Sequence, residues 1–99
     1  MLWTEMIRLT TSDPGAERLN NLFLDARRHV AKEAGLVQAR LYGSALHPNE
    51  LALSLMWDTG SPEPKGSRAG LCISQALQPF GLVEHSVWME DSVIPENRP

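Results

Sequence analysis

The sequence predicts an α+β domain of the ferredoxin-like class, in the order strand, helix, strand, strand, helix, strand. Four stretches alternate apolar and polar residues with a period of two, as strands do. Two other stretches carry apolar residues at helical spacing, one between the first and second strands and one between the third and fourth. In this βαββαβ arrangement, right-handed crossovers place both helices on one face of a four-stranded antiparallel sheet.

The first third of the chain is expected to form a strand over residues 2–11 and a helix over residues 14–34. One face of the strand is formed by Trp3, Glu5, Ile7 and Leu9. The helix should be capped by Asp13, with Pro14 at its first position. Its inward stripe is Leu19, Leu22, Phe23, Ala26 and Val30. Gly35 is expected at C′, because glycine adopts left-handed backbone angles easily.

A hairpin is predicted in the middle of the chain. Strands over residues 36–46 and 51–58 flank a tight turn at residues 47–50, where Pro48-Asn49 cannot continue a central strand. The helix-facing residues of the earlier strand are expected to be Val37, Ala39, Leu41 and Gly43. Those of the later strand are expected to be Leu51, Leu53, Leu55 and Trp57.

The last third is expected to hold a loop over residues 59–66, a helix over about 67–78 and a strand over 82–90. The inward residues of this helix should be Ala69, Cys72, Ile73, Ala76 and Leu77. The helix-facing residues of the strand should be Val83, His85, Val87 and Met89. Residues 1–90 are thus expected to form one domain, followed by a tail over residues 91–99.

The composition is that of an ordinary soluble domain, with 42% hydrophobic and 21% charged residues. The net charge of −3 argues against a nucleic-acid partner that is held through its phosphates. No apolar run approaches the roughly 20 residues that cross a bilayer, so no membrane partner is expected. The N-terminus does not read as a secretory signal, and Cys72 is the only cysteine. A cytoplasmic location is therefore expected.

The sheet face away from the helices is expected to form a homodimer interface. It should carry large apolar side chains among polar ones, namely Met6, Tyr42, Met56 and Trp88. Four such groups exceed the patch of a few hundred Å² that a monomer usually exposes. Polar residues on this face offer cross-strand or dimer-face ion pairs, such as Arg40 with Glu84. The alternative is a monomer whose sheet face is partly exposed to solvent.

The hairpin resembles the antibiotic biosynthesis monooxygenase-like family. The resemblance consists of Gly35, Leu41 and Ser44, then His47-Pro48-Asn49, Leu51, Leu53 and Trp57-Asp58, at the spacing of that family's hairpin. It implies a dimeric α+β barrel with a substrate pocket between the sheet and the two helices. Members include oxygenases of quinol-type substrates that need no cofactor, and haem-degrading monooxygenases.

The haem-degrading members use an Asn on the first strand, a Trp at the end of the third strand and a His on the second helix. Trp57 matches that Trp. The first strand has no Asn, and residues 65–80 contain no His. The resemblance therefore does not extend to haem degradation, and no cofactor is expected.

Two residues stand out for chemistry. By strand parity Trp57 faces the helices, where the resemblance implies a pocket wall that stacks on an aromatic substrate; the alternative is a core tryptophan. His85 has the same parity and is the candidate general base, because histidine exchanges protons near neutral pH. The alternative for His85 is a buried histidine with a hydrogen-bonding neighbour.

Phe23 and Cys72, on the inward stripes of the two helices, are the other candidate ligand contacts. A lone inward cysteine is more often a small hydrophobic residue than a nucleophile. His29 and His47 are expected at the surface. The histidines are scattered, so no metal site is predicted.

Two functions remain open. The first is a small monooxygenase that acts on an aromatic or quinol-like molecule without metal or flavin, with electrons supplied by the substrate. The second is a non-catalytic dimeric module for ligand binding or assembly. Other ferredoxin-like classes fit less well, because the chain lacks a Cys-x-x-Cys pair, a basic phosphate loop after the first strand and a basic sheet.

Overall fold

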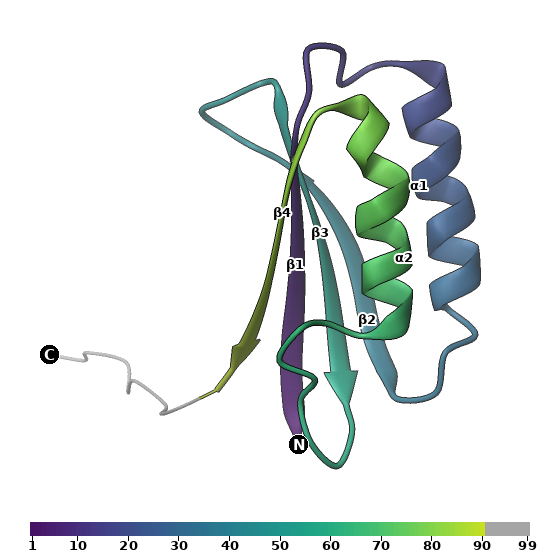
Figure 1. Ribbon diagram of the computed structural model, residues 1–99, viewed down its shortest axis with the longest axis vertical. Coiled ribbons are helices and arrows are strands. Elements are labelled where there is room, and N and C mark those ends of the chain that lie inside the picture. The colour runs from purple at the N-terminus through teal and green to yellow at the C-terminus, as the bar shows by residue number, and fades with distance from the viewer. Residues whose placement is uncertain (91–99) are drawn as a thin grey trace, which may run out of the picture.

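The predicted ferredoxin-like fold is confirmed. The computed structural model describes residues 1–90. Its elements are β1 (Leu2–Thr10), α1 (Glu17–Val30), β2 (Leu36–Gly43), β3 (Glu50–Asp58), α2 (Arg68–Leu77), the 3₁₀ helix η1 (Gln78–Phe80) and β4 (Leu82–Met89). The strands form one antiparallel sheet in the order β2-β3-β1-β4, and both helices cover the same face (Figure 1). The predicted tail, residues 91–99, lies outside the described residues.

The core lies between the central strands and the two helices. β1 and β3 alternate as predicted, because side chains of one parity face the helices. The fully buried apolar residues at its centre are Ile7, Leu9, Leu19, Leu55 and Leu77, each at most 1% exposed. Burying a large aliphatic side chain stabilises the fold by roughly 1.5–3 kcal/mol. This layer therefore fixes the helices over β1 and β3.

The first helix is shorter than predicted, at 14 residues. Asp13 is not its N-cap: the Asp13 carbonyl accepts the Ala16 N–H at 3.2 Å in a turn, and Ala16 occupies the cap without a side-chain bond. Gly35 adopts the left-handed conformation that was expected, with φ of 87°. It lies beyond the C′ position, however, and its carbonyl accepts the Asp58 N–H at 2.7 Å. Gly35 thus starts the hairpin rather than ending the helix.

The second strand begins with an irregularity that overturns one prediction. Its pairing with β3 shifts between Leu36 and Gln38, so one extra residue is inserted at Val37. Leu36 contacts the core, whereas Val37 is 55% exposed instead of facing the helices. A one-residue shift reverses side-chain parity, which explains the error. The strand also ends at Gly43, because the Ser44 hydroxyl accepts the N–H groups of the following loop.

The second helix has the predicted position but a different rotation. Its buried residues are Gly70, Ile73, Ser74 and Leu77. Cys72 is exposed, so its prediction as an inward residue was wrong. Small residues face the sheet because a Cβ at Gly70 would collide with the carboxylate of Glu5. This close approach turns Cys72 outward.

The sheet face away from the helices carries the expected mixture of residues. Tyr42 is 46% exposed and Trp88 is 62% exposed. Arg8 lies between Glu50 at 3.2 Å and Glu84 at 3.9 Å. Arg40 and Glu84 lie on the two outer strands, with β3 and β1 between them, so they are not a cross-strand pair within the chain.

Among residues 1–90, no helix is long and apolar enough to cross a membrane.

Candidate functional site

The most conspicuous polar group of the core is the carboxylate of Glu5. The alternation of β1 places Glu5 on the helix-facing side between Trp3 and Ile7. The side chain is 0% exposed. Burying a charge is unfavourable unless it is paired and hydrogen-bonded, so the surroundings of Glu5 must supply donors.

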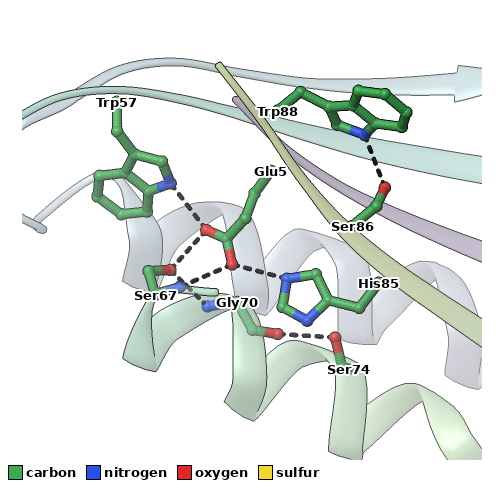
Figure 2. Close-up of polar contacts among 8 residues, drawn as sticks. All are labelled: Glu5, Trp57, Ser67, Gly70, Ser74, His85, Ser86 and Trp88. Atoms are coloured by element: carbon green, nitrogen blue, oxygen red, sulfur yellow. Dashed lines mark hydrogen bonds and ion pairs between the residues drawn. The ribbon is translucent and has the colours of Figure 1, made fainter. Parts of the chain in front are cut away.

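Four donors surround this carboxylate (Figure 2). Oε2 accepts the Trp57 Nε1–H at 2.8 Å and the Ser67 hydroxyl at 2.6 Å. Oε1 accepts the Ser67 backbone N–H at 2.8 Å and pairs with His85 Nε2 at 2.7 Å. Glu5 therefore joins β1 to β3, to the start of α2 and to β4. We call Glu5, Trp57, Ser67 and His85 the carboxylate cluster.

Two glycines make room for the cluster. Gly66 has φ of 99°, a conformation that other residues rarely adopt, and a Cβ there would lie 2.7 Å from Glu5 Oε1. A Cβ at Gly70 would lie 2.6 Å from Glu5 Cδ. The loop and the first turn of α2 can thus approach the carboxylate only because these positions have no side chain.

The start of α2 depends on the same cluster. Ser67 is the N-cap, and its hydroxyl accepts the Gly70 N–H at 2.9 Å while it donates to Glu5. One turn later, the Ser74 hydroxyl donates to the Gly70 carbonyl at 2.9 Å. A buried anion close to a helix N-terminus is also favoured by the helix dipole. The cluster therefore positions α2 on the sheet.

His85 is the member of the cluster that reaches solvent. Its side chain is 14% exposed and points to the helix side of β4, opposite Ser86 and Trp88, as its parity predicts (Figure 2). With a carboxylate as partner, Nε2 carries the hydrogen, and in the neutral imidazole Nδ1 then carries the lone pair. Among residues 1–90, His85 Nδ1 has no hydrogen-bond partner. Every fully buried side-chain N or O atom in this part of the chain does have a partner. Nδ1 is therefore not fully buried, and its orientation is fixed by the contact of Nε2 with Glu5.

Trp57 belongs to the core. It is 4% exposed, and its ring stacks on Trp3 with centroids 5.9 Å apart and planes 23° apart. The Trp3 N–H in turn donates to the Thr59 hydroxyl at 2.8 Å. Trp57 thus faces the helices as predicted, with its N–H engaged by Glu5.

The surface has two large hollows on the helix side. The interhelical groove, of about 680 Å³, lies between α1 and α2 and contains the exposed Cys72. The edge groove, of about 580 Å³, lies between α1 and the hairpin and contains Phe23. Neither groove is lined by Trp57 or His85. The structure therefore brings Trp57 and His85 together at Glu5, and it places Phe23 and Cys72 elsewhere.

The other histidines lie at the surface, as expected. His29 is exposed, and its Nδ1 contacts the Asp25 carbonyl at 2.8 Å. His47 is exposed in the hairpin loop. Within the described part of the chain, no group of three or more His, Cys, Asp or Glu residues could hold a metal ion.

Sequence reasoning missed Glu5, Ser67 and the two glycines as parts of a site. The available signal was an acid on the inward face of the first strand, between Trp3 and Ile7. Such an acid requires buried donors, and a serine just before a helical stretch is a natural N-cap. Which donors meet the acid depends on the fold.

Comparisons with known proteins identify the fold. SnoaB from Streptomyces nogalater, a cofactor-independent oxygenase, is 19% identical, with 96% of this chain and 98% of that chain covered and a TM-score of 0.69. Rv0793 from Mycobacterium tuberculosis is 19% identical over 99% of this chain and 98% of its own, with a TM-score of 0.66. A Caulobacter crescentus protein classed provisionally as an antibiotic biosynthesis monooxygenase is 17% identical over 94% and 91%, with a TM-score of 0.65. No model of a known family and no curated protein matches the sequence.

Proposed function

We propose that this chain, which has the fold of antibiotic biosynthesis monooxygenase-like proteins, is a small monooxygenase for an aromatic or quinol-like molecule, working without metal or flavin. The observation that carries the proposal is the geometry of His85. Its Nε2 is held by the buried Glu5 carboxylate at 2.7 Å, and its Nδ1 has no hydrogen-bond partner among residues 1–90 and is not fully buried. An oriented imidazole with one free nitrogen is suited to act as a general base.

The proposed chemistry needs only a proton acceptor from the protein. His85 Nδ1 takes an acidic proton from the substrate, and Glu5 stabilises the imidazolium that forms. The substrate anion supplies the electrons that reduce O₂, and a carbon–oxygen bond forms to give a peroxide. Loss of water leaves the oxidised product. With anthrone as substrate the balance is anthrone plus O₂ to anthraquinone plus water, in which one oxygen atom enters the product.

The test compares wild type with His85→Gln. Glutamine keeps an N–H donor for Glu5 but has no basic nitrogen, so the variant should fold and lose the proton acceptor. We expect protein-dependent O₂ uptake with anthrone, incorporation of one ¹⁸O atom from ¹⁸O₂, and a loss of about 100-fold or more in kcat for the variant. His47→Gln is the matched control, because that histidine is exposed in the hairpin loop, outside both grooves, and the substitution should leave the rate unchanged.

Thermal unfolding of each variant separates loss of folding from loss of the base. A His85→Gln protein that is folded and turns over at the wild-type rate contradicts the assignment of His85. Absence of any protein-dependent O₂ uptake with anthrone and related phenols contradicts the monooxygenase proposal itself.

A second candidate function is a ligand-binding module without catalysis. The observation in its favour is that both grooves lie away from His85, and that the carboxylate of Glu5 is fully occupied by donors of the protein itself. Native mass spectrometry of gently purified protein tests it. Retained aromatic mass together with no O₂ uptake favours this module, whereas turnover of the retained compound favours the enzyme.

We also propose that the chain forms a homodimer through the open sheet face. Support comes from Tyr42 and Trp88, which are large and about half exposed or more on that face, and from Met6 and Met56, which are partly exposed beside them. Apolar side chains set among charged ones suit a two-fold axis, because each group can meet its complement on the second copy.

A further inference from the structure

The open sheet face is arranged in rows that run across all four strands. Residues that pair between antiparallel strands project from the same face, so the strand register gives each row. In the strand order β2, β3, β1, β4, the central rows of this face are Tyr42-Ala52-Arg8-Glu84, Arg40-Ser54-Met6-Ser86 and Gln38-Met56-Thr4-Trp88. Arg40 therefore lies at one edge of the face and Glu84 lies at the opposite edge, in the neighbouring row.

The two edges carry opposite charges that the chain leaves incompletely paired. Arg40 forms no ion pair within residues 1–90, and the neighbour of its guanidinium is the neutral amide oxygen of Gln38, once that amide is oriented to accept. The ion-pair partner of Glu84 in this part of the chain is Arg8, at 3.9 Å, but Arg8 lies closer to Glu50, at 3.2 Å. The Glu84 side chain is 59% exposed. The open face thus has a basic edge at β2 and an acidic edge at β4.

These charged edges discriminate between the ways in which two copies can meet. Two sheets packed face to face are related by a two-fold axis that runs either along the strands or across them. An axis along the strands lays β2 of one copy over β4 of the other. An axis across the strands lays β2 over β2 and β4 over β4, so that each charged edge faces an edge of its own sign. Like charges across an interface are unfavourable, so the charges favour the axis along the strands.

The sizes of the central side chains favour the same axis. An axis along the strands brings rows of equal level together and lays β1 of one copy over β3 of the other. Met6 then faces Ser54 of the second copy, and Met56 faces Thr4 of the second copy. Large side chains opposite small ones can interdigitate, as the inner faces of packed sheets do.

The same arrangement brings Arg40 close to Glu84 of the second copy. Arg40 faces the row of Ser86, and Glu84 lies two residues further along that strand, at a distance of about 7 Å. An extended arginine side chain covers a distance of this order. Because the axis is two-fold, the contact occurs twice in the dimer.

From these observations we infer that the open sheet face binds a second copy of this chain with the two-fold axis along the strands, so that Arg40 of each copy pairs with Glu84 of the other. The inference rests on the proposed homodimer. It adds the orientation of the two copies and the charge pair that selects this orientation.

Charge reversal in the full chain tests the pairing. Arg40→Glu alone brings two acids together at each contact, and Glu84→Arg alone brings two bases together. Each variant should therefore dimerise about tenfold or more weakly than wild type in sedimentation equilibrium. An equimolar mixture of the two variants should form a heterodimer, because both of its contacts join unlike charges, and native mass spectrometry identifies it by mass. The double variant Arg40→Glu/Glu84→Arg should regain the homodimer for the same reason.

Arg28→Glu and Glu33→Arg are the matched controls. They make the same two charge changes at exposed positions on the helix side of the molecule, so each should keep the wild-type dimer. Thermal unfolding of each variant shows whether it is folded.

The outcomes separate this inference from the proposals on which it builds. Single variants that dimerise like wild type, a mixture without heterodimer, or a double variant that stays monomeric each overturn the pairing, while a wild-type dimer still stands. A wild-type chain that is monomeric at every concentration overturns the dimer itself. None of these measurements depends on O₂ uptake, so failure of the oxygenase proposal is distinguishable from both.

Discussion

Replacing Glu5 with glutamine tests the carboxylate cluster most directly. The substitution keeps size and shape but exchanges one acceptor oxygen for an NH₂ group. If NH₂ takes the place of Oε2, it faces the Trp57 N–H; if it takes the place of Oε1, it faces the Ser67 N–H. Neither N–H can accept a hydrogen bond, so at least one buried donor loses its acceptor in either orientation.

The expected loss follows from these contacts. An unsatisfied buried donor costs about 1–3 kcal/mol, and bonds to a charged acceptor are stronger than bonds to a neutral amide. We therefore expect Glu5→Gln to lower the free energy of unfolding by about 2–4 kcal/mol, a large part of the total for a small domain. Since about 1 kcal/mol corresponds to roughly 4–8 °C at this size, Tm should fall by more than about 8 °C.

Denaturant unfolding followed by tryptophan fluorescence measures this loss, because Trp57 contacts Glu5 and stacks on Trp3. Glu63→Gln is the matched control at an exposed position and should change the free energy of unfolding by less than about 0.5 kcal/mol. A Glu5→Gln protein within about 0.5 kcal/mol of wild type would refute the claim that the carboxylate holds the four elements together.

Two further predictions follow from the contacts and the open sheet face. Gly70→Ala should destabilise by about 2–4 kcal/mol, although such a change in a helix usually stabilises, because the new Cβ collides with the buried carboxylate. Gly15→Ala is the control, because a Cβ at that position has no other atom within 4 Å. Equal urea midpoints for the Gly70→Ala and Gly15→Ala proteins would contradict the predicted collision. Met56→Glu and Trp88→Glu should each convert the proposed dimer into monomer by light scattering, because they place like charges at the two-fold interface. Leu71→Glu, on the outer side of α2, should leave the proposed dimer intact. If both sheet variants keep the mass of the dimer, an interface through the open sheet face is excluded.

The carboxylate cluster illustrates which parts of a site can be predicted from sequence. Alternation alone placed Glu5, Trp57 and His85 on the helix-facing side, and all three lie there. Their meeting could not be predicted in the same way. Glu5 is separated by 52 residues from Trp57, by 62 from Ser67 and by 80 from His85 along the chain.

The errors in local structure have the same origin. The prediction for Val37 assumed uninterrupted alternation, and a single extra residue in β2 reversed it. The prediction for Cys72 followed the most apolar stripe of α2, whereas the helix is rotated so that Gly70 lies against Glu5 and Ser74 is buried. In both cases a tertiary contact outweighed the local pattern.

Short-range periodicity in the sequence determined the number and order of the strands and α-helices, and with them the ferredoxin-like fold. It also determined which side of each central strand faces the helices, because that choice depends only on neighbours two residues apart. The tertiary structure alone decided that Glu5 gathers its four donors and that Cys72 faces solvent. These features depend on distances between residues far apart in the chain, and such distances are fixed only when the helices settle on the sheet.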